Sequence, residues 1–221
     1  MKTLIAISTV ADGTMKGAAT DHDIAANRRR FLEHHHIVPE LTVLVYLRYE
    51  GDDYCRYDAV TDEDGGQGIV RDSDRINDAL FTDKKGVALF LPLADCIGAV
   101  LVDEKRGILG LSHLGRHNLE QFGARRSVEY MQQQFGSDPA DITVYMSPAA
   151  GKESYPLFAF DHRSLHDVAS EQFVVAGIMA SHIRIAEEDT TKHPAYFSHS
   201  EYLKGRQIHD GRHAIVAQLT P

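Results

Sequence analysis

Cys96 and His113 have side chains and a spacing that could place a thiol beside an imidazole. Both lie near the ends of apolar segments, and residues 104–107 (Glu-Lys-Arg-Gly) between these segments are typical of a tight turn. If these four residues form a hairpin turn, Gly98 pairs with His113, and Cys96 lies two residues further on the same face of the sheet. Diagonal neighbours of this kind are roughly 7–8 Å apart, which is within reach of a shared metal ion or proton. A register shift of one residue would separate them.

A thiol and an imidazole at this distance are compatible with three interpretations. They are two of the three protein ligands of a catalytic zinc site, whose fourth position holds water; zinc lowers the pKa of that water to about 7. Alternatively, His113 deprotonates Cys96 and makes it a nucleophile. In the third interpretation neither residue reacts, and Cys96 packs as a small apolar side chain. The spacing alone leaves all three open.

The composition excludes several classes of protein. The 221 residues include 23 Lys and Arg against 32 Asp and Glu, and this net charge of −9 argues against binding nucleic acid through its phosphates. No apolar run reaches the ~18 residues of a membrane span, and two cysteines cannot build a disulfide framework. We interpret Leu4–Val10 as a first strand instead of part of a secretion signal, and we expect a cytoplasmic protein.

Predicted strands and helices alternate along the chain, which is typical of a single mixed α/β or α+β domain. Apolar and β-branched runs predict strands over Leu4–Val10, Thr42–Tyr49, Tyr54–Val60, Val87–Leu93, Gly98–Asp103, Ile108–His113, Ile142–Met146, His182–Ala186 and His213–Leu219. We expect the second and third of these to pair with each other. Helical spacing and capping residues predict helices from Asp21 to His36, over Leu119–Phe135 and over Leu165–Val175.

Two short segments around the thiol and the imidazole resemble a known family. Residues 94–96 (Ala-Asp-Cys) and 112–115 (Ser-His-Leu-Gly) are similar to the Ala-Asp-Cys and His-Ala-Gly-Trp-Arg-Gly segments of the YfiH-like laccase-domain family, also called the polyphenol oxidase family. Further segments resemble those of the family in the same order: Ala26–Arg30, Leu47–Gly51, Asn77–Asp83, Ser147–Gly151 with Tyr155, Phe197–Ser198 and Asp210–Arg212. Each segment is short, but their common order is specific.

The resemblance implies an α+β fold with one domain over residues 1–221, built as four layers (α/β/β/α) with mixed sheets. It also implies a zinc enzyme that phosphorolyses adenosine, inosine, guanosine or methylthioadenosine and deaminates adenosine. A purine nucleoside and phosphate would then be the small-molecule substrates. Copper oxidase chemistry is the least expected, because multi-copper oxidation requires clustered histidines and the thirteen histidines of this chain are scattered. The oligomeric state stays open.

The family's zinc ligands are two histidines and the cysteine, and their positions carry over unevenly. Cys96 and His113 match two of them, whereas Glu50 stands where the family has its third, a histidine. A carboxylate can bind zinc, so Glu50 is a candidate third ligand. The family's Trp-Arg-Gly corresponds to Arg116–Asn118, and His117 within it is a second candidate for the third ligand.

Other residues are candidates for contacts to the substrate. Asp95 could orient His113 or a substrate amine, and Asn77 could do likewise. Three arginines are the available phosphate binders, because phosphate capture uses guanidinium or backbone donors: Arg28, Arg48 and Arg116. We interpret Arg212 as structural and Cys55 as a core residue. The departure at Glu50 leaves two alternatives to the nucleoside enzyme: a metal-free Cys-His hydrolase or amidase, and a paralogue without catalysis.

Overall fold

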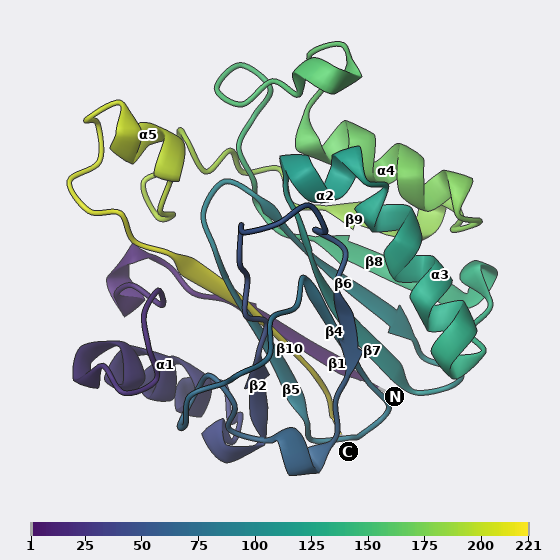
Figure 1. The fold of residues 1–221 in the computed structure, drawn as a ribbon, viewed down its shortest axis with the longest axis horizontal. Coiled ribbons are helices and arrows are strands. Elements are labelled where there is room, and N and C mark those ends of the chain that lie inside the picture. Colours follow the sequence, from purple (N-terminus) through teal and green to yellow (C-terminus); the bar gives the residue numbers. More distant parts are fainter. Residues whose placement is uncertain (1, 221) are drawn as a thin grey trace.

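The computed structural model describes residues 2–220, in which two mixed β-sheets face each other (Figure 1). The first sheet has the order β1 (Thr3–Ile7), β10 (His213–Leu219), β5 (Ala88–Leu93), β2 (Thr42–Leu44). The second has the order β3 (Tyr57–Ala59), β4 (Ala79–Thr82), β7 (Ile108–Leu114), β6 (Ile97–Asp103), β8 (Ile142–Met146), β9 (Ile183–Ile185). Three pairs are parallel (β2 with β5, β3 with β4, β8 with β9) and the others are antiparallel. The predicted α+β fold with mixed sheets is confirmed.

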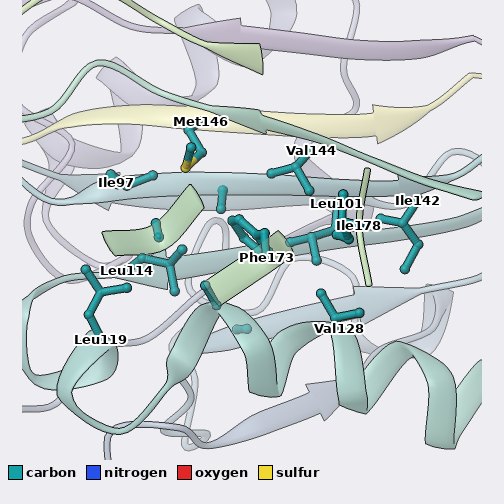
Figure 2. Packing of buried hydrophobic residues seen from close by; sticks show 14 of the residues in the cluster. Ile97, Leu101, Leu114, Leu119, Val128, Ile142, Val144, Met146, Phe173 and Ile178 are labelled. Carbon is teal, nitrogen blue, oxygen red and sulfur yellow. The ribbon is translucent and has the colours of Figure 1, made fainter. Parts of the chain in front are cut away.

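Helices cover the outer side of each sheet. Helix α1 (His22–His34) packs on the first sheet through Phe31 and Leu32, while α3 (Gly123–Phe135) and α4 (Leu165–Val175) pack on the second (Figures 1 and 2). The short helix α2 (Arg116–Glu120) directly follows β7, and the short helix α5 (His199–Leu203) directly precedes β10. Single 3₁₀ turns lie at Val10–Asp12, Pro39–Leu41, Asp62–Asp64, Pro139–Asp141, Phe158–Phe160 and Ala180–His182. The layers therefore follow the order α/β/β/α.

The second sheet is buried on both faces, and this determines where each side chain of β6 and β7 points. In β6, Ile97 and Leu101 pack against α3 and α4, whereas Val100 and Val102 pack against the first sheet. Strands buried on both faces show continuous apolar runs without polar alternation, as residues 97–102 do. The even-numbered positions of β6 therefore face the space between the two sheets.

The hairpin of β6 and β7 has the predicted register. Gly98 pairs with His113 and Asp103 pairs with Ile108. The turn is local, so its length determines the register without help from distant segments.

Two predicted elements differ from the structure. The segment Tyr54–Val60 does not pair with Thr42–Tyr49, because β2 lies in the first sheet beside β5 and β3 lies in the second beside β4. After Val45 the chain leaves the first sheet, and the N–H of Tyr46 donates to the side-chain oxygen of Asn77 instead of a strand. Closeness in sequence was therefore a poor guide to strand pairing here.

One predicted helix and one predicted strand have other bounds in the structure. The predicted helix Leu119–Phe135 is interrupted, since Phe122 adopts a left-handed backbone conformation (φ 61°) between α2 and α3. The predicted strand Leu4–Val10 ends at Ile7, and a 3₁₀ turn begins at Val10. Strands β8 and β10 and helix α4 have the predicted bounds. None of the helices within residues 2–220 is long and apolar enough to cross a membrane; the cytoplasmic location and the single-domain boundary stay predictions.

Candidate active site

A cleft of about 630 Å³ opens where β5 and β7 end and β6 begins. Its wall includes Leu93 at the end of β5, residues 94–96 leading into β6, and His113 near the end of β7. The cleft therefore lies at one end of the layer between the two sheets, and both hallmark segments contribute to it.

Cys96 and His113 lie close together in this cleft. Gly115 shows how close they are, because a Cβ atom at this position would lie 2.9 Å from Cys96 Sγ and 3.1 Å from His113 Cε1. Side-chain carbons rarely approach other atoms so closely, so glycine leaves the room that the thiol and the imidazole occupy. The hairpin thus brings the two residues together as their spacing predicts.

Burial keeps both members of this pair uncharged. His113 is 2% exposed, and burial lowers its pKa to about 4 against the opposing charge of Asp78. Burial also raises the pKa of the Cys96 thiol to about 12, with a further contribution from the Asp95 carboxylate. A thiol and a neutral imidazole are therefore the forms present at pH 7. This arrangement disfavours a metal-free thiolate–imidazolium pair, which requires the opposite shifts.

Asp95 connects the hairpin to the segment that precedes β10. Its backbone has φ 74°, a left-handed conformation that is uncommon outside glycine. Its buried carboxylate accepts hydrogen bonds from Thr190 Oγ1 (3.0 Å) and from the N–H of Ser200 (2.7 Å). No hydrogen bond within residues 2–220 joins Asp95 to His113. Asp95 therefore lines the cleft and positions the Cys96 turn, and its part in substrate binding stays a prediction.

Tyr49, and not Glu50, lines the cleft beside His113. The Glu50 side chain is 84% exposed, lies 3.8 Å from the Arg48 guanidinium, and is outside the cleft wall. Tyr49 lines the cleft, and its ring stands edge-on to His113 with the centroids 6.3 Å apart. The structure thus gives no support for Glu50 as the third ligand.

Two of the predicted substrate-contacting residues have structural partners instead. Arg28 lines the cleft, but its guanidinium donates to the carbonyls of Met15, Gly17 and Gly68. Burial lowers the pKa of Arg28 to about 10. Asn77 is 1% exposed and holds the N–H of Tyr46, outside the cleft wall. Arg48 lies outside the cleft wall, so one of the three predicted phosphate binders remains at the cleft with available donors.

That arginine is Arg116, which is exposed at the start of α2. Its neighbour His117 also lines the cleft, but the His117 ring stacks on Tyr54 with 4.6 Å between centroids. The ring nitrogens of His117 lie 3.5 Å from the Arg116 guanidinium and 3.8 Å from the Glu120 carboxylate. A ring held between these partners, one of them a cation, is poorly placed to bind a metal ion.

A zinc ion in this cleft would require a third protein ligand besides Cys96 and His113. The two donors flank one space, and His113 Nδ1 is buried without a hydrogen-bond partner among residues 2–220. However, no group of three His, Cys, Asp or Glu side chains anywhere within residues 2–220 is arranged to hold a metal ion. The donor set therefore does not complete the zinc site that the resemblance implies.

The structure adds cleft residues that were not among the candidate site residues. Arg212, interpreted above as structural, lines the cleft together with Lys16, His199, Tyr49 and Tyr155. Arg212 could have been found from the sequence because it belongs to the Asp-Gly-Arg segment that resembles the family. Tyr49 directly precedes Glu50, the residue predicted as the third zinc ligand. Nothing in the sequence pattern could have placed Lys16 here. Cys55, by contrast, is absent from the cleft wall, and its sulfur contacts the carbonyl oxygens of Asn118 and Gln121.

The chain belongs to a known family. Residues 13–159 match a family model described as "Multi-copper polyphenol oxidoreductase laccase". This match includes Cys96, His113 and the whole hairpin that carries them. It confirms the family that the ordered sequence segments indicate.

Curated relatives share the family at low identity. A protein from Geobacillus stearothermophilus named "Purine nucleoside phosphorylase YlmD" is 28% identical over 207 residues, covering 80% of this chain and 73% of the relative. A protein from Bacteroides thetaiotaomicron named "Purine nucleoside phosphorylase" is 26% identical over 116 residues. That match covers 52% of this chain and 40% of the relative's length.

Solved structures support the fold. The crystal structure of YfiH from Bacillus licheniformis matches with a TM-score of 0.82 at 23% identity, covering 94% of this chain and 85% of that one. The structure of YlmD from G. stearothermophilus also matches with a TM-score of 0.82, at 24% identity, covering 99% and 92%. At these identities the likeness concerns the arrangement of the chain and leaves the chemistry of the cleft to be tested.

Proposed function

We propose that the chain is a divergent enzyme of the purine nucleoside phosphorylase type and that the cleft at Cys96 and His113 is its active site. The observation that carries the proposal is the charge of the cleft. Arg116, Arg212 and Lys16 line it, and Asp95 is the one carboxylate that lines it among residues 2–220. A positive cleft in a chain with a net charge of −9 suits an anionic substrate such as phosphate.

The proposed reaction transfers the ribose of a nucleoside to phosphate. A phosphate oxygen forms a bond to ribose C1′ while the bond from C1′ to the purine nitrogen breaks. The electron pair of the broken bond leaves with the base, which then takes up a proton. The cationic side chains of the cleft hold the phosphate charge in place as the ribose becomes electron-poor.

Cys96 and His113 would contact the nucleoside as neutral groups. Because Cys96 keeps its proton on Sγ and His113 is uncharged at pH 7, the pair offers hydrogen bonds without repelling the phosphate or attracting it. Tyr49 and Tyr155 add apolar ring surface to the same cleft, which suits a flat purine base. The names of the curated relatives are consistent with this substrate.

The test is phosphate-dependent release of base. Purified protein is incubated with inosine, guanosine, adenosine and methylthioadenosine, with and without phosphate, and free base is measured by chromatography. Cys96→Ala removes the hydrogen-bonding thiol and should reduce the rate about tenfold. Cys55→Ala is the matched control, because Cys55 lies outside the cleft wall, and it should retain wild-type activity.

Absence of phosphate-dependent base release from all four nucleosides would refute the proposal and favour a paralogue without catalysis. Equal loss in both cysteine variants would indicate a folding defect instead of a role for Cys96. The adenosine deamination and the zinc dependence that the resemblance implies are examined in the same preparation, as inosine formed from adenosine and as bound zinc per chain.

A further inference from the structure

One side of the cleft is built around a single carboxylate. Asp210 accepts hydrogen bonds from Lys16 Nζ (2.6 Å) and from one terminal nitrogen of Arg212 (2.6 Å), and it lies 2.8 Å from His199 Nδ1. Lys16, His199 and Arg212 line the cleft, whereas Asp210 is outside its wall. The carboxylate therefore stands behind the cations and holds them toward the cleft.

The positive charge of this group exceeds what Asp210 can neutralise. Burial alone would raise the pKa of Asp210, but hydrogen bonds from Lys16, Arg212 and His199 hold it well below its usual range. Asp210 is thus ionised at neutral pH and supplies one negative charge against the two positive charges of Lys16 and Arg212. The group keeps a net positive charge whether His199 is protonated or neutral.

Hydrogen-bond donors of the same residues are left over for a ligand. Arg212 uses one terminal nitrogen for Asp210 and for the carbonyl of Gly211, and its other nitrogens have no hydrogen-bond partner within residues 2–220. Lys16 Nζ has three donors, and its hydrogen bond to Asp210 uses one of them. Both side chains line the cleft, with 19% of the Arg212 side chain and 51% of the Lys16 side chain exposed, so a ligand in the cleft can reach them.

These donors lie near the proposed reaction centre. Arg212 and Cys96 line the same cleft, and Asp95, the residue before Cys96, accepts a hydrogen bond from the N–H of Ser200, which directly follows His199 of this cluster. An anion held by Arg212 would therefore lie in the same part of the cleft as a ligand that contacts Cys96.

We propose that Lys16 and Arg212, positioned by Asp210, form a subsite for a tetrahedral phosphate group. The inference rests on the proposed function and specifies it, since it assigns the phosphate to Lys16 and Arg212 instead of to the arginines that the sequence predicts. Arg116, in a different segment of the cleft wall, supplies a further cation.

Phosphate binding is measured without a nucleoside, by titration calorimetry with inorganic phosphate. Lys16→Gln should raise the dissociation constant about tenfold, because it removes a charged hydrogen-bond donor. Lys16→Arg keeps the charge and should restore most of the affinity. Lys192→Gln is the matched control, since the Lys192 ammonium pairs with Glu153 outside the cleft, and it should bind phosphate as the wild type does.

A second variant distinguishes a loss of phosphate binding from a folding defect. Arg212→Lys keeps the charge at this position but loses the forked geometry of the guanidinium, so it should weaken phosphate binding severalfold while the melting temperature stays near that of the wild type. In the nucleoside assay both variants should raise the KM for phosphate more than the KM for the nucleoside. A purely structural role would change both constants or neither.

The outcomes separate this inference from the proposed function. If phosphate binds and the variants weaken it, but no nucleoside is cleaved, the subsite stands and the proposed function fails. If nucleosides are cleaved and the variants bind phosphate as Lys192→Gln does, the subsite is refuted and the proposed function stands. A parallel titration with adenosine monophosphate identifies the source of the phosphate group: binding of this ester, but not of inorganic phosphate, would overturn the assignment to the co-substrate.

Discussion

His213 allows a test of the structure that does not depend on catalysis. Its side chain is fully buried on β10, and neither ring nitrogen has a hydrogen-bond partner within residues 2–220. The ring packs against Tyr196 with 5.1 Å between centroids. Burial lowers the pKa of His213 to about 4, and the Asp95 carboxylate offsets only part of this effect. The folded protein therefore holds this imidazole neutral.

Holding this imidazole neutral lowers the free energy of unfolding when the pH falls. In the unfolded chain a histidine takes up a proton near pH 6.5, whereas the folded chain does not protonate His213 until about pH 4. Between these values the unfolded state binds more protons, so the free energy of unfolding decreases as the pH decreases. The loss is about 1.4 kcal/mol per pH unit, or about 3 kcal/mol over the whole interval. His113 has a pKa shift to the same value and adds a comparable loss.

We predict that His213→Leu removes the part of this pH dependence that comes from His213 and leaves the part that comes from His113. At pH 7.5 the variant should be as stable as the wild type or slightly more stable, because an unpartnered buried polar side chain is replaced by an apolar one of similar volume. Below pH 6.5 the stability difference should grow in favour of the variant by about 1.4 kcal/mol per pH unit. Urea unfolding at pH 7.5, 6.5, 5.5 and 4.5 measures both quantities.

The same substitution at an exposed histidine is the control. The His22 side chain is 96% exposed, so His22→Leu should follow the pH dependence of the wild type. A difference between His213→Leu and the wild type that stays constant from pH 7.5 to 4.5 would refute the reasoning. It would mean that the folded protein protonates His213 as readily as the unfolded chain does.

Three further changes test separate parts of the site. Gly115→Ala should lower turnover at least about tenfold and leave the melting temperature within a few degrees of the wild type, because the added carbon displaces the Cys96 thiol and the His113 ring within the cleft; unchanged turnover would contradict this. Glu50→Gln should leave activity and bound zinc as in the wild type, since the carboxylate is 84% exposed; a loss of zinc in elemental analysis would restore Glu50 as a ligand. Asp210→Asn should destabilise the protein more at pH 7 than at about pH 3, because a lowered carboxyl pKa stabilises the fold fully above about pH 4 and progressively less as the pH falls below that value; urea unfolding at both pH values decides, and an equal loss at both would be inconsistent with the ion cluster.

The sequence predicted local features of the site better than long-range ones. The hairpin register that brings Cys96 beside His113 follows from a short turn and alternating side chains, so it could be derived without the rest of the molecule. The pairing of Thr42–Tyr49 with Tyr54–Val60 was wrong, because each segment finds a partner from elsewhere in the chain. Pairing between distant segments depends on packing that no local pattern records.

The roles of the cationic residues also depend on contacts between distant segments, which the sequence does not reveal. Arg28 has the residue type of a phosphate binder, but backbone carbonyls occupy its donors. Arg212 was interpreted as structural, although it has free donors at the cleft. Lys16 reaches the cleft through an ion pair with Asp210, which is 194 residues away in the sequence. Residue type therefore indicated which chemistry was available, and the fold determined which side chains can supply it.

The location of charge explains how an acidic chain can bind an anion. Over the whole molecule the net charge of −9 repels phosphate, but in a concave site with low-dielectric walls the nearest charges dominate. Because Cys96 and His113 are neutral at pH 7, the positive potential of the cleft comes from Lys16, Arg28, Arg116 and Arg212, which lie far apart in the sequence. Anion binding is therefore a consequence of the tertiary fold, whereas the hallmark segments that identify the family supply an uncharged pair for contact with the rest of the substrate.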